Sequence, residues 1–245
     1  MTKKPSRWTK IQSGLNGKTL GIYGGIILLD HLLWNTIIIY PLKILTVFFH
    51  ELSHALAAIA TGGEVREIVL VPEQGGHCLI AGGNGFLVYS AGYLGSLIWG
   101  GIILMSAANS KRDKQIMIGL GAILIAVSFI WIRPFISFGF IFCIILGGVM
   151  MASGNYLPTK VNDWVLRIIG LTSCLYATLD VKDDTIDRNL QESDAGRLAE
   201  ITGMPSLFWG YFWMAMAILG TILFILLASM VQVKGKGNTE GTSPS

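Results

Sequence analysis

Two histidines and a glutamate lie near the middle of an apolar stretch of this chain. The stretch is KILTVFFHELSHALAAIAT, residues 43–61, and it holds His50, Glu51 and His54 in the pattern His-Glu-x-x-His. Residues four positions apart lie on one face of a helix, so the two imidazoles can converge on a single ion. Ionisable side chains inside a membrane segment are costly and usually mark a functional site. The pattern therefore predicts a metal site with His50 and His54 as ligands.

Glu51 projects from the neighbouring side of the same helix, where it can reach a water molecule on the metal instead of the metal itself. The motif divides the work in this way in zinc metallopeptidases. Zinc would lower the pKa of the water toward ~7, and Glu51 would take its proton as general base and pass it to a leaving amine. The alternative is that both histidines of the motif are core or interfacial residues with ordinary hydrogen bonds. The chain's other two histidines, His31 and His77, lack such neighbours, and we expect both to be structural or interfacial.

Two histidines do not complete a catalytic zinc site, which usually takes three protein ligands and keeps one position open. The leading candidate for the third ligand is Asp180, because it ends an apolar run, SCLYATLD, that begins well inside the bilayer. Asp184 would share the helical face of Asp180 if the helix continues, and Asp30 in the first apolar run is the other candidate. Asp183 and the acids that follow it, within residues 181–206, are expected to be solvated.

The composition predicts the kind of protein that must hold these residues. Hydrophobic residues make up 52% of the 245 and charged residues only 13%, whereas a soluble domain carries roughly 25% charged residues. A bilayer core requires about 20 apolar residues per helix. The apolar runs cover residues 20–40, 42–60, 86–107, 116–132, 135–152, 164–179 and 207–233. Arg133-Pro134 separates the fourth run from the fifth, because proline disfavours helix at the preceding residue. We expect an all-α polytopic membrane protein with about six to seven transmembrane helices.

A glycine-rich segment follows the second apolar run. It reads TGGEVREIVLVPEQGGHCLIAGGNG, residues 61–85, and its alternating β-branched residues and glycine pairs predict a small β-hairpin or sheet. Such a backbone can lie at membrane depth only when it is packed in protein or lines a wet cavity, so we expect it to form a wall of the site. In the third run, AGYLGS at residues 91–96 places small residues four apart, which predicts a close approach to the metal-binding helix.

Charge and cysteine patterns bound the rest of the chain. Lysines and arginines cluster before the first apolar run, so residues 1–19 are expected to form a basic cytoplasmic N-terminal segment. Residues 20–233 would form the membrane metallopeptidase-like domain, and 234–245 a polar, disordered tail. A net charge of only +3 argues against nucleic acid as a partner. Three scattered cysteines, Cys78, Cys143 and Cys174, do not form a disulfide framework.

These motifs together resemble a known family. HELSHA in an early membrane helix, then a glycine-rich β-like segment and a late LD-containing segment, is similar to the site-2 protease group of intramembrane zinc metallopeptidases. The chain is most similar to an uncharacterised peptidase-like branch of that group, found in bacteria and in fungi and other eukaryotes. The matching stretches are FHELSHALAAIATGGEV, GGHCLIAGGNGFLVYSAGYLGS, LYATLDVKDD and ESDAGRLAEITG, within residues 42–210.

The resemblance implies zinc (Zn2+) bound by His50, His54 and Asp180, with Glu51 as the catalytic base. Here Leu179-Asp180-Val181 stands where the group has Leu-Asp-Gly. The implied function is hydrolysis of peptide bonds in membrane or juxtamembrane proteins or peptides, with the lipid bilayer as the surroundings. The alternative is a non-catalytic zinc-containing membrane scaffold or partner-binding protein of the same fold. Organelle, substrate and oligomeric state do not follow from the sequence.

Counting spans places the candidate ligands at different depths. With seven alternating spans and a cytoplasmic N-terminus, His50 lies about 12 Å from the outer end of its span at 1.5 Å per residue, whereas Asp180 lies at the inner end of its own. Either the Arg133-Pro134 region is not two full spans, or Asp180 lies deeper because Arg167 marks the real start of its apolar core, or the third ligand is elsewhere. Two other membrane classes fit less well, because a histidine-box diiron enzyme needs more than four histidines and a transporter would show an internal repeat.

Overall fold

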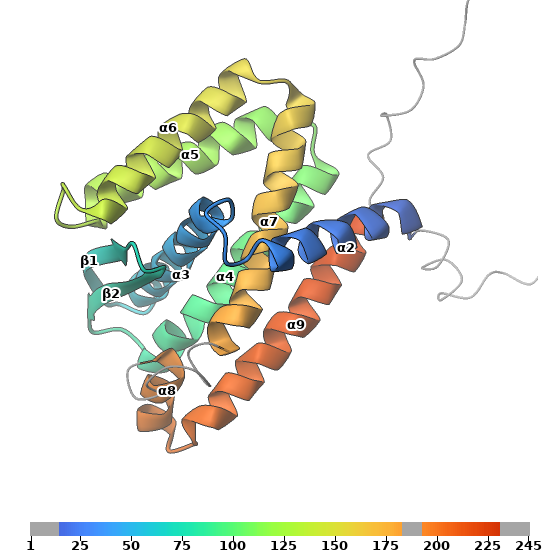
Figure 1. The fold of residues 1–245 in the computed structure, drawn as a ribbon. Coiled ribbons are helices and arrows are strands. Elements are labelled where there is room, and N and C mark those ends of the chain that lie inside the picture. The colour runs from blue at the N-terminus through green and yellow to red at the C-terminus, as the bar shows by residue number, and fades with distance from the viewer. Residues whose placement is uncertain (1–14, 183–192, 231–245) are drawn as a thin grey trace, which may run out of the picture.

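Most of the described chain is helical. The computed structural model describes residues 15–182 and 193–230. Two strands, β1 (Glu64–Val71) and β2 (Gly75–Ala81), lie between the second and third helices along the chain (Figure 1). The helices are α2 (Gly17–Leu32), α3 (Tyr40–Ala60), α4 (Gly85–Asn109), α5 (Asp113–Trp131), α6 (Phe138–Tyr156), α7 (Thr159–Lys182), α8 (Asp194–Thr202) and α9 (Ser206–Met230).

Six of the described helices are long and apolar enough to cross a membrane, namely α3, α4, α5, α6, α7 and α9. The chain is an integral multi-pass membrane protein, as its composition predicts. Helix α2 has 16 residues, about 24 Å at 1.5 Å per residue, which is short of the roughly 30 Å hydrocarbon core. Turns at residues 33–39 separate it from α3. The first predicted run, 20–40, is therefore not one continuous helix.

Helices α5 and α6 form a separate pair that projects from the rest of the bundle (Figure 1). They are joined by the turn that contains Arg133-Pro134, so the prediction of two spans here is confirmed. Ser137 caps α6, because its Oγ accepts a hydrogen bond from the backbone N–H of Phe140 at 3.2 Å. A Cβ atom at Gly121 would lie only 2.5 Å from the carbonyl oxygen of Gly147. Glycine is required there for the two backbones to meet.

The glycine-rich segment forms the predicted β-hairpin. Strands β1 and β2 pair antiparallel, with Ile68 opposite Cys78 and Leu70 opposite Gly76. The side chains of Ile68 and Leu70 are fully buried in the core that contains α3 and α5. Ile68 also forms a bridge with Ile132 at the end of α5. The hairpin is thus fixed between α3 and the α5–α6 turn.

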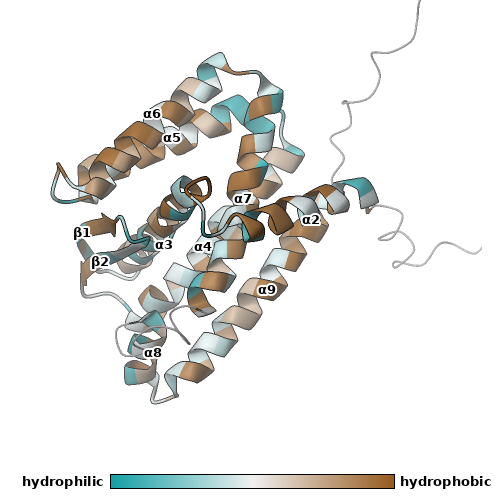
Figure 2. Cartoon of the chain, viewed as in Figure 1, coloured by the Kyte–Doolittle hydropathy of each residue, from teal (hydrophilic) through white to brown (hydrophobic). Residues whose placement is uncertain are grey.

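Helix α3 is the interior helix of the molecule. Its residues 43–55 are all buried, and Phe49 stacks on Trp99 of α4 with ring centroids 5.4 Å apart. The outward surfaces are apolar instead: Figure 2 shows hydrophobic residues over much of α6, where Ile145 and Val149 are exposed to the surroundings. Exposed apolar side chains of this kind suit a lipid-facing surface. The polar residues of the motif therefore lie inside the protein and not against lipid.

Helix α8 is a short amphipathic helix at the end of the bundle where α9 begins (Figure 1). Ser193 caps it by accepting a hydrogen bond from the N–H of Gly196 at 3.2 Å, and Gly203 ends it with a positive φ of 73°. Ala195 and Leu198 are fully buried against an aromatic cluster that includes Tyr93 of α4. This packing holds the first turn of α8 against the rest of the protein.

Candidate metal centre

The His-Glu-x-x-His segment lies in the middle of α3, as predicted. The rings of His50 and His54 lie 4.7 Å apart, and both side chains are buried. Helix α4 packs against this face through small residues: a Cβ atom at Gly92 would lie 2.6 Å from Nε2 of His54, and one at Gly95 would overlap Ser53. The predicted close approach of α4 to the metal-binding helix is therefore confirmed.

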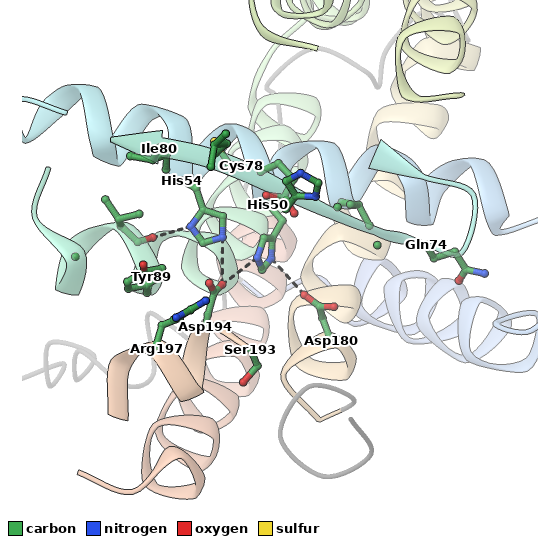
Figure 3. A pocket seen from close by; sticks show the side chains of 18 of the residues that line it. His50, His54, Gln74, Cys78, Ile80, Tyr89, Asp180, Ser193, Asp194 and Arg197 are labelled. Carbon is green, nitrogen blue, oxygen red and sulfur yellow. Dashed lines mark hydrogen bonds and ion pairs between the residues drawn. The ribbon is translucent and has the colours of Figure 1, made fainter. Parts of the chain in front are cut away.

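A carboxylate from α8 completes this face. Oδ2 of Asp194 lies 3.1 Å from Nε2 of His50 and 3.1 Å from Nε2 of His54 (Figure 3). These three ligand atoms form a group that could hold a metal ion. They come from two elements, α3 and the first turn of α8, that lie far apart in the sequence.

The other nitrogen of each imidazole faces an acceptor. Nδ1 of His54 lies 2.7 Å from the carbonyl oxygen of Val88 and donates to it, which leaves a lone pair on Nε2. Nδ1 of His50 lies 3.2 Å from Oδ2 of Asp180. A ring proton on each Nδ1 would turn both Nε2 lone pairs toward Asp194, which is the form in which an imidazole binds a metal through Nε2.

In that protonation state the arrangement suits a cation. Two imidazole lone pairs and a carboxylate oxygen repel one another unless positive charge lies among them. Two nitrogens and one oxygen are a donor set of catalytic zinc sites, with bonds of about 2.0–2.2 Å. Ligand atoms at such bond lengths around a tetrahedral ion lie about 3.3 Å apart, close to the two 3.1 Å separations observed. The donors present therefore fit a zinc-sized ion.

Asp194 is anionic in this setting. Burial raises the pKa of its carboxyl group, but the positive charge and the hydrogen bonds of His54 and His50 when protonated lower it by more, so that the pKa lies below its usual range. An ionised carboxylate is the form that binds a metal ion.

Glu51 lies beside this group without joining it. Its side chain is buried, and its carboxylate reaches β2, where a Cβ atom at Gly76 would lie 2.8 Å from Oε1 of Glu51. The pKa of the Cys78 thiol on the same strand is raised to about 12, mainly by burial and in smaller part by the negative charge of Glu51. The glutamate therefore lines the same cavity as His50, His54 and Asp194.

A cavity of about 810 Å³ opens onto these residues. Its walls are α3, β2, the start of α4, the end of α7 and the first turn of α8 (Figure 3). Residues 74–80 of the hairpin all line it. The glycine-rich segment therefore forms a wall of the site, as predicted from the sequence.

The sequence-based candidates for the third ligand have different positions. Asp180 contacts His50, but on Nδ1, and it is not part of the ligand group; its predicted ligation of the metal stays a prediction. Asp30 is buried elsewhere and accepts a hydrogen bond from Thr172 at 2.8 Å. Asp184 lies outside the described residues. The expectation of different depths for His50 and Asp180 is wrong, since the two side chains are in contact.

One expectation about the late acidic segment is also wrong. The acids after Asp183 were expected to be solvated, yet only 15% of the Asp194 side chain is exposed and its carboxylate meets both histidines. The signal for it was local: Ser193 is a helix cap, and Ala195 and Leu198 form an apolar face that must be buried. When this apolar face packs against the protein, the neighbouring carboxylate of Asp194 becomes buried as well. Of the remaining histidines, His77 lines the cavity and His31 is exposed.

Comparison with known proteins identifies one family. A family model described as Peptidase M50B-like matches residues 23–227. The matched range contains both histidines of the motif, Glu51, Asp180 and Asp194, and nearly all of the membrane-spanning helices. No curated protein and no solved structure matches the chain.

Proposed function

The chain belongs to the Peptidase M50B-like family, and from this membership we propose that it is a membrane-embedded zinc metallopeptidase acting on membrane or juxtamembrane substrates. The observation that carries the proposal is the meeting of Nε2 of His50, Nε2 of His54 and Oδ2 of Asp194 beside the carboxylate of Glu51. Ligands and a separate base in one cavity are what a hydrolytic zinc site needs.

The three ligand residues would hold the ion through two imidazoles and one carboxylate. Zinc bound there supplies polarisation of the substrate carbonyl and brings the pKa of a water molecule to about 7. The backbone carbonyl of Val88 fixes His54 in the tautomer that presents Nε2. Gly92 leaves the space in front of the imidazoles, which a larger residue would fill.

Glu51 would serve as the general base. It lies next to His50 on α3, is buried, and is not one of the three grouped ligand residues. Its carboxylate would take a proton from the attacking water and deliver it to the amine nitrogen that leaves. Gly76 on β2 leaves room for the carboxylate in this position.

Strand β2 would bind the substrate backbone. Among the described residues it pairs only with β1, and an unpaired strand edge offers backbone donors and acceptors to an extended peptide. Successive strand residues point to opposite faces. Because consecutive residues 74–80 all line the cavity, the cavity must run along the strand's edge. An extended peptide lying there would pass the metal position.

Metal content tests the first half of the proposal. Full-length protein purified in detergent micelles should carry about one zinc per chain by elemental analysis, and the double variant His50→Ala/His54→Ala close to none. Zinc near zero in the wild-type protein, or zinc unchanged in the double variant, would rule out the site.

Proteolysis tests the second half. A panel of single-span model substrates in micelles is incubated with the protein, and the products are identified by mass spectrometry. Glu51→Gln should keep its zinc and lose cleavage by about 10²–10⁴-fold, the usual contribution of a general base. Glu64→Gln, at an exposed position on β1, should change neither. Zinc-loaded wild-type protein that cleaves no substrate would favour the non-catalytic scaffold, and cleavage by Glu51→Gln would reject the base.

A further inference from the structure

Asp180 and Asp194 contact opposite nitrogens of the same imidazole. Oδ2 of Asp180 lies 3.2 Å from Nδ1 of His50, and Oδ2 of Asp194 lies 3.1 Å from Nε2. Figure 3 shows the ring of His50 between the two carboxylates, Asp180 on α7 and Asp194 on α8. A ring that ligates a metal through Nε2 holds its Nδ1 edge away from the ion. A carboxylate on that edge lies behind the ligand.

The two histidines are supported in parallel ways. His54 directs its Nδ1 to a backbone oxygen of Val88 at 2.7 Å, while His50 has Asp180 at the equivalent nitrogen. Nδ1 of His50 is fully buried and has no well-aligned hydrogen-bond partner among the described residues, and the carboxylate that it contacts is that of Asp180. An imidazole N–H buried in this way needs an acceptor, and Asp180 supplies one, with only 15% of its side chain exposed.

We propose that Asp180 is a positioning residue, whose carboxylate accepts the proton of His50 Nδ1 and so holds Nε2 toward the ion, while Asp194 completes the ligand set. This inference rests on the proposed zinc site. A carboxylate behind a metal-bound histidine fixes the tautomer and the orientation of the ring and raises the basicity of the ligand. Losing such a partner typically weakens metal affinity 10–100-fold without removing the site.

The competing assignment makes Asp180 a direct ligand, as the sequence resemblance implies. The two roles differ in what asparagine can do. An asparagine amide oxygen can still accept a hydrogen bond from Nδ1, but it replaces an anionic zinc ligand poorly. A positioning role therefore predicts that Asp180→Asn is better than Asp180→Ala, whereas a ligand role predicts that both fail alike.

The experiment measures zinc affinity in the full-length protein by competition with a chelator, together with the absorption spectrum of the Co2+-substituted protein. Asp180→Ala should bind one equivalent of metal 10–100-fold more weakly than wild type, with a Co2+ spectrum of unchanged coordination number. Asp180→Asn should recover part of this loss. Asp194→Ala should lose a ligand, which changes the Co2+ spectrum. Asp30→Asn, at a buried carboxylate bonded to Thr172, is the matched control and should keep wild-type affinity.

Two results would overturn the inference while leaving the zinc site intact. The first is an affinity of Asp180→Ala within twofold of wild type. The second is loss of stoichiometric metal in Asp180→Ala and Asp180→Asn alike, with Asp194→Ala retaining it. Wild-type protein without metal would instead contradict the proposed function, and the inference with it. Thermal unfolding of the metal-free variants separates any folding defect, and Asp180→Asn, which keeps the side-chain volume, serves where Asp180→Ala does not fold.

Discussion

Gly92 of α4 lies directly against His54 of α3, so closely that a Cβ atom at position 92 would stand 2.6 Å from the imidazole Nε2. The same Cβ atom would overlap His50. The space in front of both ligand nitrogens therefore depends on the absence of a side chain at one position of a neighbouring helix. The absence of a side chain at Gly92 therefore allows both the close packing of α4 on α3 and the proposed binding of a metal by the two imidazoles.

Replacing this glycine should damage the metal site more than the fold. In Gly92→Ala, the methyl group must displace one or both imidazoles, and we expect zinc content to fall from about one per chain to less than one tenth. Gly119→Ala on α5 is the control, because nothing lies within 4 Å of a Cβ atom there. Elemental analysis of both purified variants decides the matter. Wild-type zinc content in Gly92→Ala would show that the imidazoles do not use this space.

Gly76 on β2 should matter for catalysis and not for metal binding. A Cβ atom there would lie 2.8 Å from Oε1 of Glu51, so Gly76→Ala should push the carboxylate aside. We expect normal zinc content and at least a 10-fold lower cleavage rate of model substrates. Gly119→Ala on α5, whose Cβ atom would meet nothing within 4 Å, should retain the wild-type rate. Equal rates in the two variants would argue against a role for Glu51 at this position.

Docking of α8 should be coupled to metal affinity, because Asp194 reaches the histidines only when α8 is packed. Leu198 is fully buried against the aromatic cluster, and a buried leucine replaced by alanine costs about 2–5 kcal/mol. We expect Leu198→Ala to bind zinc at least 10-fold more weakly in chelator competition. Ile201→Ala, at a position 51% exposed on the same helix, should bind as wild type does. Unchanged affinity in Leu198→Ala would mean that Asp194 is held by other contacts.

The helix contact between α4 and α7 should matter for stability. A Cβ atom at Gly100 would lie 2.7 Å from the carbonyl oxygen of Gly170, so Gly100→Ala must separate the helix that carries Asp180 from its neighbour. We expect a lower unfolding temperature for metal-free Gly100→Ala in micelles. Gly148→Ala on α6, which meets nothing within 4 Å, should unfold at the wild-type temperature or above it. The reverse order of the two variants would contradict the close packing.

The sequence predicts the part of the site that is local. His50, Glu51 and His54 lie on one helix, and their relation follows from helical geometry alone. The hairpin wall and the approach of α4 also follow from nearby glycines and small residues. These features depend on spacing within single elements, which a sequence displays directly.

Asp194 depends on contacts between elements, which spacing does not display. Its acidic surroundings favour a solvated loop, and only the burial of Ala195 and Leu198 against the aromatic cluster turns it inward. The expectation that Asp180 and His50 lie at different membrane depths is wrong for a related reason. Depth counting treats every apolar run as a full crossing, whereas α2 has only 16 residues and is followed by turns.

The central claim is that His50, His54 and Asp194 hold one metal ion. An experimental structure of the zinc-loaded protein, with anomalous scattering measured at the zinc edge, tests it most directly. The account predicts one anomalous peak within about 2.2 Å of Nε2 of His50, Nε2 of His54 and a carboxylate oxygen of Asp194, with Asp180 on Nδ1 of His50. A peak that lacks Asp194 as a ligand, or no peak between the two imidazoles, would contradict it.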